Sequence, residues 1–350
     1  MNRVHRIQQQ FRKENIDGLL VTNPINIKYL VGCDDGILFL SRKKAILFMH
    51  YMNREQMEKK ISGCEIRSGD ENPLVLFSKS RELKRMKRLG FESDVVTVSQ
   101  AKSFKKSIKV KFVPKVGIVE GLRKKKEAVE IKLIKKASKL TVEVLKSILS
   151  LLKVGVREID IAAEIDYNLR KRGGVPAFPP IVASGCNSSM PHAEPSRRRL
   201  KKGDLVIIDL GASYRGYASD MTRTLCIGKP NRRQKDIYEI VLEAQKRAVK
   251  FARDSISTKE LDDAARSLIT NRGYGERFIH GLGHGVGLDV HEAPRISSKS
   301  KDKIEEGMVL TIEPGIYIPN FGGVRIEDTV LINKDRCQVL TTASKEFMEM

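Results

Sequence analysis

The first part of the chain alternates short apolar runs with polar, helix-forming segments. The runs DGLLVT (17–22) and KKAILFMHY (43–51) are typical of buried strands. Further along, RELKRMKRL (81–89) predicts a basic helix, and DVVTV (94–98) predicts a strand with another helix after it. This alternation of strands and helices predicts an α/β domain over residues 1–122.

The second part, residues 123–350, opens with the charged run RKKK and two helical patterns. Apolar residues at helical spacing, such as Ile131 and Ile134, predict one long helix through Leu152. The run REIDIAAEIDYNLRKRGG (157–174) repeats apolar residues every four positions and predicts a second helix. Beyond it the sequence becomes rich in glycine, histidine and carboxylates, so the chemistry is expected in this second domain.

Two distant apolar runs that end in a carboxylate form an internal repeat. KKGDLVIIDLGASY is echoed by EEGMVLTIEPGIYI, so that Asp209 corresponds to Glu313. Asp220 in SDMTRTL and Glu327 in IEDTVLI begin the next strand pattern of each copy. The repeat predicts two hairpins that face each other across a pseudo-twofold centre, with all four carboxylates at that centre.

Four carboxylates cannot share a buried space as bare anions. Protonation would relieve the repulsion, and so would two divalent cations, which would also create a hydrolytic site. His284, in the glycine-rich run HGLGHGVGLDVHEAP, is then the expected imidazole ligand. His192 and His291 are expected beside the metal ions, where they would hold the substrate or the developing oxyanion. His280 and His50 are expected to be core or supporting residues.

Composition narrows the remaining classes of function. A hydrophobic content of 41% and a charged content of 31% fit a globular protein, and no apolar run reaches the roughly 18 residues of a membrane span. The N-terminus lacks the apolar segment of a secretory signal, which predicts a cytoplasmic protein without a membrane partner. Five scattered cysteines without a C-x-x-C pair argue against disulfides or a thiolate zinc site.

The net charge of +22 raises the question of a nucleic-acid partner. Aromatic residues for base stacking are sparse near the basic runs, and no nucleic-acid motif is present. A solvated basic surface without a specific nucleic-acid partner is therefore expected.

The ligand order Asp, Asp, His, Glu, Glu resembles that of the metallopeptidases of the pita-bread fold, which include methionine aminopeptidase, aminopeptidase P, prolidase and creatinase. The motifs GDLVIIDLGASYRGYASDMTRT, HGLGHGVGLDVHEAP, GMVLTIEPGIY and GGVRIEDT carry this resemblance. It implies an α+β pita-bread catalytic domain with a pseudo-twofold repeat, preceded by a smaller α/β creatinase-type N-terminal domain. Methionine aminopeptidases typically lack such a domain, and the chain is most similar to the prolidases.

The resemblance implies that Asp209 binds one metal ion and that His284 and Glu313 bind the other. Asp220 and Glu327 would bridge the two ions. A water between the ions would attack the scissile carbonyl, and Glu313 would carry a proton to the leaving proline nitrogen. Such ligands suit Mn²⁺ or Co²⁺ as well as Zn²⁺.

Prolidases hydrolyse the Xaa-Pro bond of dipeptides and are usually homodimers, and both properties are expected here. A guanidinium is the natural clamp for the free carboxylate of a dipeptide. Arg295 and Arg325 are the candidates, although Arg325 could instead brace Glu327 and Arg295 could be an ordinary surface residue. Two alternatives stay open: an aminopeptidase P that acts on longer Xaa-Pro peptides, and a non-enzymatic peptide-binding relative, which the complete ligand set opposes.

Overall fold

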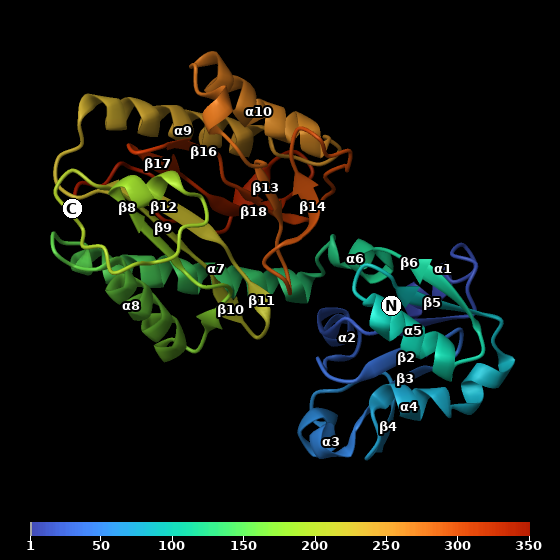
Figure 1. The fold of residues 1–350 in the computed structure, drawn as a ribbon. Coiled ribbons are helices and arrows are strands. Elements are labelled where there is room, and N and C mark those ends of the chain that lie inside the picture. Colours follow the sequence, from blue (N-terminus) through green and yellow to red (C-terminus); the bar gives the residue numbers. More distant parts are fainter. Residues whose placement is uncertain (1) are drawn as a thin grey trace. The chain divides into compact units, whose positions relative to one another are not determined.

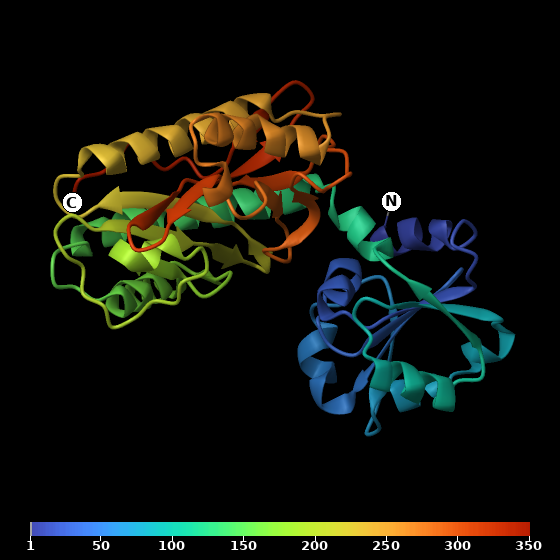
Figure 2. The same cartoon turned by 45° about the horizontal axis from the view of Figure 1, so that its top comes forward.

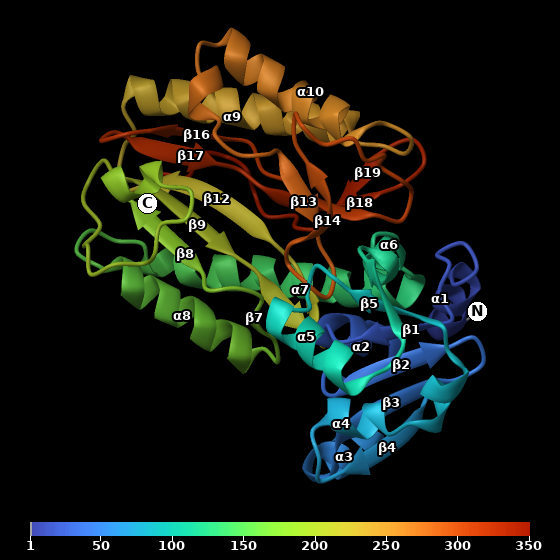
Figure 3. The ribbon, with the colours of Figure 1, turned by 45° about the vertical axis from the view of Figure 1, so that its right-hand side comes forward.

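A computed structural model describes residues 2–350 as two compact units, one that ends at Arg123 and one that comprises Lys124–Met350. The strands of the first unit are β1 (Gly18–Val21), β2 (Ile37–Ser41), β3 (Ala45–His50), β4 (Glu65–Gly69), β5 (Arg88–Glu92) and β6 (Lys111–Lys115). Its helices are α1 (Arg3–Gln10), α2 (Pro24–Val31), α3 (Tyr51–Glu58), α4 (Pro73–Ser78), α5 (Val98–Ser107) and α6 (Ile118–Arg123). The strands form one mixed sheet in the order β4–β3–β2–β1–β5–β6, flanked by the helices (Figure 3).

Two predictions for the first unit are wrong. The segment RELKRMKRL is a short 3₁₀ turn, Arg81–Arg85, followed by β5, and the run DVVTV is a turn rather than a strand. Thr97 lies at the N-terminus of α5, where its side chain and that of Gln100 form a capping box. Local side-chain bonding therefore outweighs the β-propensity of the valines. The strand position is filled by RLGFE, which pairs with both β1 and β6.

The second unit contains two pairs of helices. They are α7 (Ala128–Ile148), α8 (Glu158–Lys171), α9 (Arg232–Phe251) and α10 (Thr258–Asn271). The long helix predicted through Leu152 thus ends at Ile148, with a short 3₁₀ turn after it. In Figures 1 and 2 the strands of this unit lie between α7 and α8 on one side and α9 and α10 on the other.

The strands of the second unit repeat one arrangement twice. They are β7 (Val175–Pro176), β8 (Ile181–Ser184), β9 (Leu205–Leu210), β10 (Ala212–Tyr214), β11 (Tyr217–Ala218), β12 (Met221–Cys226), β13 (Gly283–Gly285), β14 (Glu292–Ile296), β15 (Val309–Ile312), β16 (Gly315–Ile318), β17 (Gly322–Arg325), β18 (Asp328–Ile332) and β19 (Cys337–Val339). In each half, two helices precede an antiparallel strand pair, β9–β12 or β15–β18. A short hairpin, β10–β11 or β16–β17, joins the two strands of each pair. The predicted pseudo-twofold repeat is confirmed.

Each half of the second unit has its own apolar core. Ile161 and Ile165 of α8 pack with Val206 and Ile208 of β9 in one cluster, and all four are essentially unexposed. The other cluster joins α9 and α10 to β15 and β18. The apolar side chains of the strands pack against the helices, so the polar side chains at the strand ends can face the centre. Among residues 2–350, no helix combines the length and apolarity that crossing a membrane requires.

Candidate metal centre and active site

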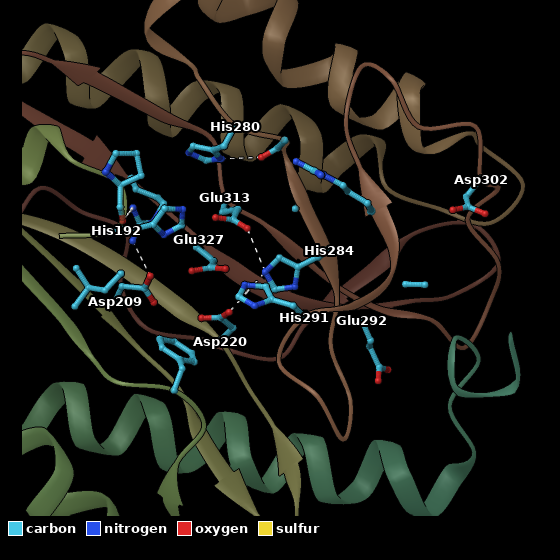
Figure 4. A pocket seen from close by; sticks show the side chains of 18 residues that line it. His192, Asp209, Asp220, His280, His284, His291, Glu292, Asp302, Glu313 and Glu327 are labelled. Carbon is cyan, nitrogen blue, oxygen red and sulfur yellow. Dashed lines mark hydrogen bonds and ion pairs between the residues drawn. The ribbon is translucent and has the colours of Figure 1, made fainter. Parts of the chain in front are cut away.

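The strand pairs bring the predicted ligands together from both halves of the repeat. Asp209 is part of β9, and Asp220 directly precedes β12, whose antiparallel pairing with β9 places Thr222 opposite Asp209. Glu313 follows β15 and Glu327 precedes β18, which is the same arrangement in the second half. Figure 4 shows these four carboxylates around one space, with the ring of His284 beside them.

Distances within this group are those of a cation site rather than of a packed core. The Nε2 atom of His284 lies 3.3 Å from Glu313 Oε1 and 3.8 Å from Asp220 Oδ2. Potential ligand atoms of Asp220, His284 and Glu327 lie within 4.8 Å of one another. Among the described residues, the buried Oδ1 atoms of Asp209 and Asp220 have no hydrogen-bond partner. Unpaired buried carboxylate oxygens are costly, so the donor set fits divalent cations.

Burial and neighbouring charges shift the pKa values of these carboxylates. Burial, together with repulsion from Glu327 and Asp209, raises the pKa of Asp220 well above its ordinary value. Burial and repulsion from Glu313 raise the pKa of Glu327 in the same way. Burial also opposes charge on Glu313, but the hydrogen bond and positive charge of His284 outweigh it and lower the Glu313 pKa to about 2. A bound cation would offset the repulsion between these buried carboxylates and so stabilise their charged forms.

Two threonines tie the halves of the repeat to each other at the centre. The hydroxyl of Thr222 donates to Glu327 Oε2 at 2.7 Å, and Thr222 belongs to the other half of the repeat. Reciprocally, the hydroxyl of Thr329 donates to the carbonyl of Asp220 and accepts from its backbone N–H. Each threonine lies two residues after the acid of its own half, in SDMT and IEDT. That echo was visible in the sequence and could have identified both threonines as supporting residues.

Arg325 is the partner of Asp209. Its buried guanidinium donates to Asp209 Oδ2 at 2.6 Å, to Thr222 Oγ1 at 3.0 Å and to the hydroxyl of Tyr317 at 2.9 Å, and it also reaches the carbonyl of Pro191. Buried carboxylates are stabilised by a charged partner of this kind. Arg325 thus pairs directly with Asp209, and it supports Glu327 through the hydroxyl of Thr222, which accepts from Arg325 and donates to Glu327. These hydrogen bonds leave its guanidinium little capacity to clamp a substrate.

His280 is part of the site, although the sequence favoured a core or supporting role without a specific partner. Its Nδ1 lies 2.8 Å from the carbonyl of Gly281, and its Nε2 lies 3.0 Å from the Tyr317 hydroxyl. Burial lowers the pKa of His280, which favours the neutral ring. Its position four residues before His284 was the available sequence signal. His50, by contrast, lies in the first unit and caps α3, so it is neither core nor site.

A cavity of about 740 Å³ opens onto the carboxylate centre. His192, His291 and Arg295 all line it, as do the apolar side chains of Phe178 and Ile181. The ring of His291 lies 4.4 Å from that of His284, and burial beside the His284 charge lowers the His291 pKa. Arg295 is exposed and lies opposite His284 in the β13–β14 pair. The cavity thus combines a cation site, hydrogen-bonding rings and a free guanidinium.

Comparisons with known proteins agree with this geometry. The sequence profile of metallopeptidase family M24 matches residues 132–334, and that of the creatinase/prolidase N-terminal domain matches residues 3–125. The Xaa-Pro dipeptidase of Pyrococcus furiosus is 40% identical over 99% of both chains. The structure of a Bacillus anthracis Xaa-Pro dipeptidase aligns with a TM-score of 0.97, 38% identity and 99% coverage of both chains. An X-Pro aminopeptidase from Thermotoga maritima aligns with a TM-score of 0.92, 33% identity and 100% coverage of both chains.

Proposed function

Since this chain belongs to metallopeptidase family M24, we propose that it is an Xaa-Pro dipeptidase that hydrolyses the bond before proline in dipeptides. The observation that carries the proposal is the convergence of four carboxylates and His284 beside a cavity lined by Arg295. Its M24 relatives include Xaa-Pro dipeptidases that match nearly the whole chain. A non-enzymatic binding protein would have no need for a complete ligand set.

Five residues would hold two divalent metal ions. Asp209 is assigned to one ion, His284 and Glu313 to the other, and Asp220 and Glu327 to both. When bound, such ions polarise a carbonyl and lower the pKa of a water. The unpaired Oδ1 atoms of Asp209 and Asp220 support this assignment, because cations would satisfy them. Oxygen ligands with one imidazole favour Mn²⁺ or Co²⁺, with Zn²⁺ as a further candidate.

The chain's own residues would then bind the peptide and move its proton. Glu313 is assigned the proton transfer to the proline nitrogen, since a tertiary amide nitrogen must be protonated before it leaves. His192 and His291 line the cavity and are assigned hydrogen bonds to the substrate or to the developing oxyanion. The low pKa of His291 keeps its ring neutral at neutral pH, so one ring nitrogen is a donor and the other an acceptor.

Arg295 is assigned the clamp on the dipeptide carboxylate, because the guanidinium of Arg325 is held by Asp209. A tripeptide places a neutral carbonyl at that distance from the scissile bond. Arg295 is exposed, so an unused guanidinium stays hydrated and the loss is that of a charged hydrogen bond. A bond of that kind contributes about 1.5–3 kcal/mol, which corresponds to about 10- to 150-fold in kcat/KM.

The test compares Met-Pro with Met-Pro-Ala as substrates in the presence of Mn²⁺ or Co²⁺. The unmodified protein should prefer the dipeptide by about 10- to 150-fold in kcat/KM. Arg295→Ala should remove most of that preference, whereas Arg277→Ala, at an exposed arginine outside the cavity lining, should not. Equal rates on both peptides in the unmodified protein would reject the dipeptidase and favour an aminopeptidase P. A preference that survives Arg295→Ala would place the clamp elsewhere.

Further properties are proposed with this activity. We propose a cytoplasmic homodimer that needs no nucleic-acid partner, with the domain boundary between residues 122 and 123. Light scattering of the purified protein tests the dimer, which requires a mass of about twice the 39.5 kDa of one chain.

A further inference from the structure

A charged pair on α10 holds the backbone on both sides of His280. Asp262 and Arg266 are one helical turn apart and form a bidentate pair, with Nε 2.6 Å from Oδ2 and Nη2 3.0 Å from Oδ1. Asp262 is completely buried. Neither residue lines the carboxylate cavity. The pair therefore lies behind the site and not within it.

Three further hydrogen bonds connect this pair to the segment that precedes His284. The guanidinium of Arg266 donates to the carbonyls of Phe278 at 2.8 Å and His280 at 2.6 Å. Asp262 Oδ1 accepts from the N–H of Leu282 at 3.0 Å. Arg266 also stacks over the ring of Phe278 at 4.0 Å, and that ring meets His280 edge-on. Three alternate residues of one irregular segment are thus fixed by two side chains.

The hydrogen bonds of the His280 ring connect this anchored segment to the carboxylate centre. A carbonyl can only accept, so Nδ1 carries the ring proton and donates to Gly281. In the neutral ring, Nε2 must then accept the hydroxyl proton of Tyr317. The Tyr317 oxygen in turn accepts from Arg325, which donates to Asp209. Hydrogen bonds on the backbone and on the ring of His280, joined through that residue itself, therefore connect α10 to one of the carboxylates of the centre.

We propose that Arg266, held by Asp262, is a positioning residue for the hydrolytic reaction. It sets the backbone at His280 so that the ring accepts from Tyr317, which fixes Arg325 and the orientation of Asp209. Metal-site residues depend on outer partners in this manner, and loss of such a partner typically costs about 10- to 100-fold in activity. The inference rests on the proposed dipeptidase activity.

Arg272, the residue that caps the C-terminus of α10, offers a matched control. Arg272 forms an ion pair with Glu243 at 2.8 Å, and both side chains are about half exposed. That pair connects α10 only to α9 and reaches no residue of the cavity lining. Equal substitutions at Arg266 and Arg272 therefore separate a general effect on α10 from an effect on His280.

The experiment measures Met-Pro hydrolysis by Mn²⁺-loaded Arg266→Lys, Tyr317→Phe, the double variant and Arg272→Lys. Lysine keeps the charge opposite Asp262, but its single nitrogen cannot maintain the bidentate pair and both carbonyl bonds. Arg266→Lys should lower kcat about tenfold with KM nearly unchanged, and Arg272→Lys should change neither. The double variant should be no slower than Tyr317→Phe alone, because both substitutions break the same chain.

The proposal would be overturned if the losses of kcat in Arg266→Lys and Tyr317→Phe were additive in the double variant, or if kcat in Arg266→Lys were unchanged. If Arg266→Lys does not fold, the variant that combines Asp262→Asn with Arg266→Gln takes its place, because it buries no unpaired charge. It is then compared, alone and together with Tyr317→Phe, in the same way. Nitrogen-15 spectra of the histidine rings provide a readout without substrate. They should show His280 protonated at Nδ1 in the unmodified protein and disturbed in Arg266→Lys. If the unmodified protein fails to cleave Met-Pro, the dipeptidase proposal fails, while an undisturbed His280 spectrum would still overturn the role of Arg266.

Discussion

The stability of the metal-free protein should fall as the pH rises. Burial and repulsion raise the pKa values of Asp220 and Glu327 well above normal, so each carboxyl releases its proton at a higher pH in the native protein than in the unfolded chain, where it ionises near about pH 4. A group with a raised pKa stabilises the native state fully below its unfolded pKa, and this contribution is lost as the pH climbs toward the folded value. The pKa of His284, which burial lowers but Glu313 raises further, is also shifted upward and acts in the same direction.

The magnitude follows from the number of protons involved. Each carboxyl that is protonated in the native state and ionised in the unfolded state lowers the free energy of unfolding by about 1.4 kcal/mol per pH unit. The two together give up to about 2.8 kcal/mol per pH unit, against a total stability of about 5–15 kcal/mol for a typical protein. Glu313 does not oppose this trend, because its pKa of about 2 leaves it ionised throughout the range from pH 5 to pH 8.

The assay is urea unfolding of chelator-treated protein at pH 5, 6, 7 and 8. The matched control is the double variant Asp220→Asn with Glu327→Gln, which keeps both shapes but has no proton to lose. Its pH slope should be smaller than that of the unmodified protein by most of the predicted amount. Saturating Mn²⁺ should reverse the trend, because protons compete with the metal for the same oxygens. A metal-free stability that is flat or rises from pH 5 to pH 8, equally in both proteins, would refute the reasoning.

Three further predictions follow from the centre and its surroundings. Elemental analysis after saturation with Mn²⁺ should find about two ions per chain, and a folded protein that binds none would contradict the assignment. Glu327→Gln keeps its shape but loses a charge that both ions share, so activity should fall more than about 100-fold with an unchanged circular dichroism spectrum; wild-type-like kcat at metal saturation would count against it. Gly211→Ala would place a Cβ 2.2 Å from the carbonyl oxygen of Ser219 and 2.5 Å from the ring of Phe178. Overpacking of this kind costs about 1–3 kcal/mol and should lower Tm. Gly121→Ala should not, because apart from its chain neighbours and the backbone of its own helix no atom lies within 4 Å of the added Cβ.

The sequence alone was sufficient to place the carboxylates at one centre. Strand periodicity is local, so the apolar run before Asp209 and its echo before Glu313 both predicted buried strands, which the structure contains. A repeat of sequence implies a repeat of structure, and this brought Asp220 and Glu327 to matching places. Helical spacing was equally local and predicted α8 correctly. Where two local signals competed, as at Thr97, the capping bonds decided the outcome and the predicted strand was wrong.

Only the tertiary structure could assign partners to these residues. Arg325 pairs with Asp209 across 116 positions of the chain, and Tyr317 meets His280 across 37. A pattern of apolar and polar residues predicts which side chains are buried. It does not predict which distant hydrogen-bond donor each buried acceptor will contact. That choice depends on how two separately packed cores bring β9, β15 and the segment before β13 to the same place. The anchoring of this segment by Arg266 has no local sequence signal at all, because its hydrogen bonds go to backbone carbonyls, which every residue carries.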